Sequence, residues 1–394
     1  MSEFQYYEFR TVDRPLSAED REALRAISTR AEITATSFTN SYSWGDLKGA
    51  PVDFMVQWFD LHVYVTNWST RRFMLRLPKR LVDVADLQTR LARFDDLVKI
   101  RLTDEHLILD INWTDEEPDD EWVEEESWLP ALAPLRTDIL EGDLRFIHLL
   151  WLKALQLDVV EDSLDIDDNG EGPVFMEPDD PEPMAGIGPL TEQLRTFAEF
   201  FRIDPDLIAA AAERSPDRRS VSAETIRMEI ATVPEDIRTD ILTRLYAGDP
   251  IVMTEWRVAV RAALPSEAET APSTVKPRTA AEVLARSIEI RTVREKAEAD
   301  RKLAEQRRLA REAEAARRAH LDMLATRGER VWDEIEREIE RRNGPGYDAA
   351  AGLILDMQTL ALKQGTDDEF VYRLEVIRER HARKPRFIDR LADF

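Results

Sequence analysis

The chain has 394 residues, and its 79 Asp and Glu residues against 54 Lys and Arg residues give a formal net charge of −25. It contains no cysteine, which excludes a disulfide framework, a thiolate zinc site, a cysteine nucleophile and an iron–sulfur cluster. The excess of acids argues against a protein that coats nucleic acid or binds an anionic membrane surface, because both partners attract Lys and Arg.

Residues 1–157 are predicted to form an aromatic-rich α+β domain, because strand and helix patterns follow each other in irregular order. Aromatic and β-branched runs predict strands at Phe4–Val12, Ile33–Phe38, Arg72–Leu77, Val98–Leu102 and Leu107–Ile111. Helical spacing of apolar residues predicts helices at Pro51–Val65, Val82–Phe94 and Ile139–Leu157. A capping box formed by Ser17 and Asp20 predicts the start of another helix.

Two segments carry most of the negative charge. Nine acids lie in 115–126, and eleven lie between Asp158 and Glu182 with no Lys or Arg among them. Because like charges repel and apolar residues are few, we expect an acidic loop at 115–126 and an acidic disordered linker at 158–185. The remainder of the chain is close to neutral.

The C-terminal half is predicted to be mostly helical. Its composition indicates a helical domain at 186–264, a linker at 265–278, a long charged helix at 279–342 and a C-terminal helical segment at 343–394. Thr191, Thr279 and Thr366 have the sequence signals of helix N-caps.

The long helix is unusual because it offers few apolar side chains. Between Arg294 and His320 the only large apolar residues are Leu303 and Leu309. Oppositely charged residues four apart, such as Glu314 and Arg318, support a solvated helix. A weak coiled coil or a helix that docks on a partner are the alternatives, and the lack of a sustained Leu or Ile heptad argues against strong self-assembly.

No phosphate-binding, dinucleotide-binding or nucleophile-elbow motif occurs in the sequence, so no catalytic residue and no cofactor are assigned. The run from Asp165 through Asp167 and Asn169 matches the first half of a calcium-binding loop. The pattern fails at its last position, where Met176 stands in place of the bidentate Glu. We therefore expect no metal ion there.

A set of aromatic and charged residues in the first domain forms our candidate partner-binding surface. Its members are Trp44, Asp46, Lys48, Arg71, Arg72, Arg76, Lys79, Arg80, Trp122 and Trp128. Two alternatives stay open: the basic residues pair with an acidic segment of the same chain, and Trp122 and Trp128 anchor the acidic loop to the core. The basic end, Arg378–Arg390, has the same alternatives of an intramolecular acidic partner or a bound anion.

Both ends of the chain resemble an uncharacterised family of bacterial cytoplasmic proteins. The resemblance rests on short runs of residues: Tyr6-Tyr7-Glu8-Phe9, Asp13-Arg14-Pro15-Leu16, Ser28-Thr29-Arg30-Ala31, Trp44-Gly45-Asp46, Asn67-Trp68, Thr70-Arg71-Arg72 and Arg380-His381-Ala382-Arg383-Lys384-Pro385. It implies a bacterial cytoplasmic setting and brings no assigned activity.

These features favour a non-enzymatic interaction or scaffold protein that binds protein partners through the N-terminal domain and the C-terminal helices. One alternative is an enzyme of unrecognised type, with a site near Trp44–Lys48 and Arg71–Arg80. Another is an acidic mimic of nucleic acid that regulates a DNA-binding protein. We expect a cytoplasmic protein with no nucleic-acid or membrane partner, and weak homo-oligomerisation through the long helix is a further possibility.

Overall fold

The computed structural model describes residues 4–114, 127–164, 177–184, 186–215, 223–249, 251–263 and 276–392. The chain divides into two compact units, Met1–Val293 and Arg294–Phe394. An antiparallel sheet with helices makes up the N-terminal part, and the rest is mostly helical with one long helix. The fold class predicted from the sequence is therefore confirmed.

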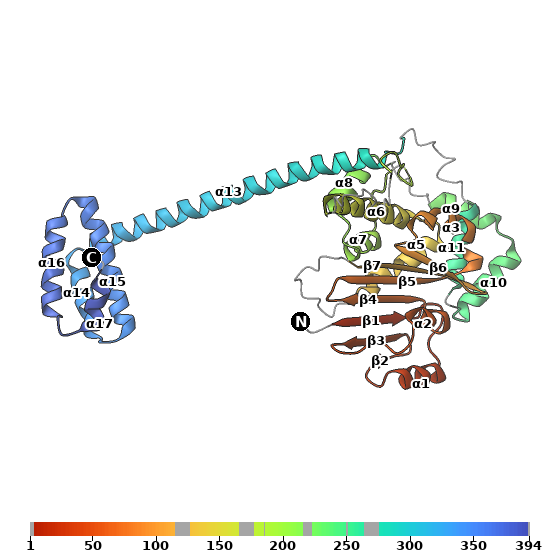
Figure 1. Cartoon of the computed structure of the whole chain (residues 1–394), viewed down its shortest axis with the longest axis horizontal. Helices are drawn as coiled ribbons and strands as arrows, with labels where there is room; N and C mark the ends of the chain where they lie inside the picture. The colour runs from red at the N-terminus through yellow and green to blue at the C-terminus, as the bar shows by residue number, and fades with distance from the viewer. Residues whose placement is uncertain are drawn as a thin grey trace. The chain divides into compact units, whose positions relative to one another are not determined.

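Within the described residues, seven antiparallel strands form one sheet at the centre of the first unit (Figure 1). In the order in which they lie side by side, they are β2 (Glu32–Ile33), β3 (Ser37–Tyr42), β1 (Gln5–Arg10), β4 (Leu61–Thr66), β5 (Thr70–Pro78), β7 (His106–Thr114) and β6 (Val98–Leu102). Successive side chains of a strand point to opposite faces. In β5, Phe73 and Leu75 therefore join one core, and Met74 joins the other.

Helices cover both faces of this sheet. On one face, Leu24 of α1 (Ala18–Ile27) and Phe54 of α2 (Pro51–Gln57) pack with Phe9 of β1. The other face packs against α3 (Val84–Leu91), α4 (Leu129–Leu132), α5 (Pro134–Leu140), α6 (Arg145–Leu164), α7 (Glu192–Phe200) and α8 (Pro205–Ala212). Helices α9 (Ala223–Thr232), α10 (Glu235–Tyr246) and α11 (Val252–Ala263) also belong to this unit.

The structure shows that the predicted helix at Pro51–Val65 is wrong in its second half. Helix α2 ends at Gln57, and β4 begins at Leu61. Met55, Phe59 and Val63 have helical spacing, but β-branched and aromatic residues alternate from Leu61 onward, and both faces of this strand are buried. The helical spacing therefore led to a helix prediction for residues that form β4, which pairs with β1 and β5.

Other predicted elements are divided by turns. The strand predicted at Ile33–Phe38 is split between β2 and β3, because the Thr34 hydroxyl accepts hydrogen bonds from the backbone N–H groups of Thr36 and Ser37. The helix predicted at Ile139–Leu157 is split into α5 and α6 by Gly142, whose φ of 83° is a conformation that favours glycine.

Part of the segment predicted as an acidic linker is packed in the first unit. Glu182 is only 4% exposed, and its carboxylate accepts a hydrogen bond from the backbone N–H of Arg278. The Glu182 N–H donates in return to the Arg278 carbonyl. The Arg278 side chain then donates to the Ala210 carbonyl and pairs with Glu213. These hydrogen bonds of Glu182 and Arg278 hold the residues just before the long helix against the first unit.

The long helix, α13, spans Ala280–Arg327, so its start agrees with the predicted helix at 279–342. Its end does not, because Gly328, with a φ of 53°, separates α13 from α14 (Glu329–Glu340). Its capping box forms as predicted, since the Glu282 N–H donates to the Thr279 hydroxyl and the Thr279 N–H donates to the Glu282 carboxylate. Every residue from Thr292 to Ala319 is exposed. Ion pairs such as Arg308–Glu312 and Arg318–Glu314 lie along this stretch, and pairing of α13 with a second chain stays a prediction.

The second unit is a helical bundle. It contains the end of α13 together with α14 (Glu329–Glu340), α15 (Gly344–Gln364), α16 (Asp367–Arg380) and α17 (Pro385–Ile388). Leu324, Ile335, Ile354 and Leu374 are among the residues of its core. His320 of α13 lies 2.8 Å from the Asp356 carboxylate of α15, which joins those two helices.

The capping box of α1 gives a direct test of a cap predicted from the sequence. The Ser17 hydroxyl accepts from the Asp20 N–H, so we expect Ser17→Ala to lower the free energy of unfolding by about 1 kcal/mol. Thr191 stands at the N-cap of α7 but makes no capping hydrogen bond. Thr191→Val is therefore the matched control, with little change expected. Equal losses in the two variants, measured by urea denaturation, would contradict the capping assignment.

Candidate functional site

The loop that holds Trp44, Asp46 and Lys48 is fixed on the sheet by two hydrogen bonds. The Tyr7 hydroxyl donates to the Asp46 carboxylate at 2.6 Å, and the Gln5 amide donates to the Gly45 carbonyl at 2.9 Å. Burial and the bond to Asp46 raise the pKa of Tyr7 well above its ordinary value. Trp44 is 73% exposed, so the loop is held in place while its indole faces solvent.

Arg71 and Trp128 meet on the face of the sheet that packs against α4 and α7. The Arg71 guanidinium lies over the rings of Trp128 and Phe200, and it donates to the Phe200 carbonyl at 3.0 Å. Trp128 and Phe200 pack edge to face. Trp128 therefore packs at the beginning of α4 between the sheet and α7, which agrees with the open alternative that it serves as an anchor.

The other cations of the predicted group between Arg71 and Arg80 have partners within the first unit. Arg72 makes two hydrogen bonds with Asp110, and Arg76 makes two with Asp60. Lys79 donates to the Thr103 carbonyl, and Arg80 pairs with Glu255 of α11. Because Arg71 lies on the opposite face of β5 from Arg72 and Arg76, the structure does not bring the predicted basic residues together as one surface.

A buried charge network around Asp60 was not anticipated from the sequence. Asp60 is fully buried, and its carboxylate accepts from the N–H groups of Val12 and Asp13 as well as from Arg76. Arg136 of α5 joins it by donating to the Asp13 carboxylate and to the Arg76 carbonyl. These residues are far apart in sequence, so only the fold assembles them.

The pKa values of the two carboxyl groups in this network shift in opposite directions. Burial alone would raise the pKa of Asp60, but the charges of Arg76 and Arg136 and the hydrogen bonds from Val12 and Asp13 hold that pKa below its ordinary value. Burial raises the pKa of Asp13, and the neighbouring charge of Asp60 adds to the rise. The network joins the ends of β1 and β4 to β5 and α5, so we assign it a structural role.

Some predicted site residues lie outside the described residues. They are Trp122 and the calcium-loop positions Asp165, Asp167 and Asn169. Within the described part of the chain, no group of three or more His, Asp or Glu side chains could hold a metal ion.

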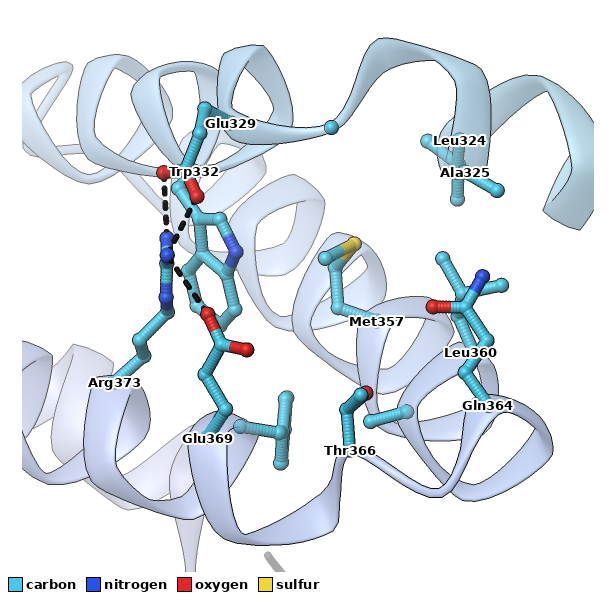
Figure 2. Close-up of a pocket in the computed structure, with 13 residues that line it drawn as sticks. Leu324, Ala325, Glu329, Trp332, Met357, Leu360, Gln364, Thr366, Glu369 and Arg373 are labelled. Atoms are coloured by element: carbon cyan, nitrogen blue, oxygen red, sulfur yellow. Dashed lines mark hydrogen bonds and ion pairs between the residues drawn. The ribbon is translucent and has the colours of Figure 1, made fainter.

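The second unit contains a pocket that the sequence did not single out. A cavity of about 180 Å³ lies between the end of α13, the start of α14, the end of α15 and the start of α16. Its apolar lining includes Leu324, Met357, Leu360, Ala361 and Phe370. Figure 2 shows Leu324 and Ala325 on one side of the pocket and Leu360 with Gln364 facing them.

A fixed group of polar side chains forms one rim of this pocket. Arg373 donates to both carboxylate oxygens of Glu329 and to Glu369, and its guanidinium lies over the Trp332 ring (Figure 2). The bonds to Arg373 hold the pKa of Glu329 below its ordinary value. The indole of Trp332 also packs near Phe370, so the rim is joined to the apolar floor through aromatic contacts.

Two glycine junctions lie next to this pocket: Gly328 lines it, and Gly365 stands between the lining residues Gln364 and Thr366. Gly328 ends α13 with a φ of 53°, and Gly365 ends α15 with a φ of 69°, both in the left-handed region that favours glycine. Each junction turns the chain sharply, so side chains on either side of it diverge. The capping box expected at Thr366 and Glu369 does not form, since the Thr366 side chain makes no capping hydrogen bond. Thr366 and Glu369 line the pocket instead.

The basic C-terminal end is paired inside the same bundle. Arg380 and His381 contact the Glu336 carboxylate, and Lys384 pairs with Glu340, so this end is joined to α14. Arg390 pairs with Asp348 of α15. These carboxylates lie outside the two acidic segments that the sequence pointed to as partners.

No protein-family model, curated protein or solved structure matches this chain. Among the residues that the structure describes, no helix has both the length and the apolar composition needed to cross a membrane.

Proposed function

We propose that this is a non-enzymatic interaction protein whose C-terminal bundle takes an apolar side chain of a partner protein into the pocket between Gly328 and Gly365. The observation that carries the proposal is a pocket in which apolar side chains lie beside the fixed polar group of Glu329, Glu369 and Arg373, since binding sites combine apolar lining with placed polar groups. A cavity of about 150 Å³ can hold a benzene molecule. A volume of about 180 Å³ therefore suits one large aliphatic or aromatic side chain.

The residue types at the rim support a protein partner. Trp and Arg are the residues most enriched among those that dominate interface energies, and here Arg373 holds Trp332 in place at the edge of the hollow. Both side chains are already ordered by intramolecular contacts. Binding would therefore cost less conformational entropy than it would with free side chains.

We do not propose an enzymatic site at Trp44–Lys48 and Arg71–Arg80. A catalytic or anion-binding role needs cations that are directed at a ligand, whereas Arg72, Arg76 and Arg80 are each paired with a carboxylate of the first unit. A partner contact on the first unit stays a prediction from the sequence. The exposed Trp44 is the side chain that best fits it.

The proposal is tested by filling the pocket. Ala325 lines the pocket and is exposed, so Ala325→Phe should occupy the hollow with little effect on the core. Ala315 is exposed on α13 and is absent from the pocket lining. Ala315→Phe makes the same change at a matched helical position, with the same loss of helix propensity.

Peptides are selected from a displayed random library on the full chain, and their dissociation constants are measured by fluorescence polarisation. We expect selected peptides to share an apolar anchor residue. Ala325→Phe should weaken their binding about tenfold or more, as loss of a main anchor contact would, while Ala315→Phe should leave it unchanged. Failure to select any peptide, or equal affinities for the two variants, would count against the proposal.

A further inference from the structure

We infer that the partner segment recognised by this pocket is basic as well as apolar: an apolar anchor residue flanked by Lys or Arg. This inference rests on the proposed function, and it adds the charge of the partner to it. The argument comes from the distribution of charge around the pocket, which is separate from the shape and composition of the hollow.

One acid, Glu369, lines the pocket at the start of α16, and two more acids precede it in the sequence. The residues Gln364, Thr366, Glu369 and Phe370 line the pocket. The stretch from Gln364 to Phe370 contains three acids in succession, Asp367, Asp368 and Glu369, and no Lys or Arg. All three acids are exposed in the first turn of α16. A segment that enters the pocket would therefore pass beside Glu369, in the same helical turn as Asp367 and Asp368.

Glu329 adds a carboxylate on the other side of the pocket (Figure 2). Arg373 is shared between Glu329 and Glu369, so one guanidinium offsets two carboxylates and the rim keeps a negative charge. The side chains of Glu329 and Glu369 are 75% and 64% exposed. Their charges are thus available to a ligand as well as to Arg373.

The nearest bases in the sequence do not reverse this balance. Arg330 follows Glu329, and Lys363 precedes Gln364, and like Asp367 and Asp368 they do not line the pocket. These two bases offset those two acids, so the charge of the lining residues sets the balance. Among the residues that line the pocket, an acidic partner would meet the two carboxylates of Glu329 and Glu369 and only one shared guanidinium. A basic partner would instead form new ion pairs there, because complementary charge at a rim favours encounter and excludes partners of the wrong sign.

The test compares two variants of the full chain that lose the same charge. Asp367→Asn combined with Asp368→Asn removes two charges beside the pocket without touching the Arg373 bonds. Glu295→Gln combined with Asp300→Asn removes two charges from exposed positions on α13 that do not line the pocket. The probes are the library peptides selected on the unmodified chain, measured in 50 mM and in 500 mM NaCl.

We expect the selected peptides to carry Lys or Arg within a few residues of the apolar anchor and to lack acids there. The pocket-side variant should bind them about 2- to 30-fold more weakly at low salt, as the loss of two exposed ion pairs would give. The α13 variant should bind them unchanged, and high salt should remove the difference between the two. Together these results would support a basic partner.

Other outcomes separate this inference from the proposed function. Selected peptides with an apolar anchor, sensitivity to Ala325→Phe and no charge preference would overturn the basic partner and leave the pocket as a binding site. Peptides rich in acids would overturn it in the same way. Recovery of no peptide would remove both the proposed function and the inference built on it.

Discussion

Replacing Asp60 with Asn is expected to destabilise the first unit by about 3–5 kcal/mol, as does breaking other buried ion pairs by removal of one partner. The substitution keeps the volume of the side chain but removes the charge that offsets Arg76. It also places a donor among the donors supplied by Val12, Asp13 and Arg76. Replacement thus leaves a buried guanidinium without its counter-charge, and that is the largest part of the expected loss.

Urea denaturation followed by tryptophan fluorescence is a suitable measurement, because eight of the nine tryptophans lie in residues 1–293. The matched control is Asp86→Asn, which removes a carboxylate paired with Arg90 at an exposed position. That pair should contribute no more than about 1 kcal/mol. Similar losses in the two variants would contradict the assignment of the Asp60 network as the main polar support of the sheet.

The loss of stability caused by Asp60→Asn, relative to the unmodified chain, is expected to depend on pH. The folded-state pKa of Asp60 lies below its ordinary value of 3.8. Its stabilising contribution is therefore complete above pH 3.8 and is lost as the pH falls through the folded pKa. Asp13 shifts in the opposite sense, so the comparison is made in an Asp13→Asn background. The stability difference caused by Asp60→Asn should be constant near neutral pH and should shrink below pH 3.8.

A second large effect is expected at Gly346, near the start of α15. A Cβ atom added there would lie 2.6 Å from the backbone carbonyl oxygen of Glu338 in α14 and 3.1 Å from the Arg341 side chain. Neither α14 nor α15 can relieve a clash with backbone by a side-chain movement alone. We therefore expect Gly346→Ala to destabilise the second unit by about 1–3 kcal/mol, as overpacking commonly does.

Gly352 supplies the matched control in the same helix. A Cβ atom added at Gly352 meets nothing within 4 Å, so Gly352→Ala should stabilise the helix by about 0.5–1 kcal/mol through its higher helix propensity. Hydrogen exchange of peptides from α14 and α15 in the full chain measures both effects locally. Changes of the same sign in the two variants would show that the close approach of α14 and α15 at Gly346 is not as described.

Local sequence signals were sufficient where an element is determined by its own residues. The capping boxes at Ser17 and Thr279, the strands β6 and β7 and the start of the long polar helix all appear where short-range patterns place them. Local signals failed at β4, where helical spacing and strand alternation coexist in one run. Pairing with β1 and β5 decided in favour of the strand.

The candidate binding surface and the pocket could be predicted from local sequence signals far less well than the helices and strands. The sequence pointed to Arg71–Arg80 as a cluster, but neighbouring positions of a strand face opposite sides of the sheet, and each cation found a partner that is distant in sequence. The pocket gave no sequence signal, because Leu324, Trp332, Met357 and Arg373 come from four different helices. A polar–apolar pattern shows only which face of a helix is buried, and it does not show which helix ends will meet.

The sequence by itself determined the class of the fold, the absence of cysteine chemistry, the position of the long polar helix and the location of the acidic segments, because these follow from composition and short-range periodicity. Only the tertiary structure decided that Arg72 and Arg76 of β5 pair with carboxylates of the first unit and that Asp60 is the centre of a buried charge network. It alone also brought together the four helices that line a pocket beside Trp332. The physical reason is that ion pairs and cavities are made by groups far apart in the chain, whose meeting depends on how complete helices and strands pack.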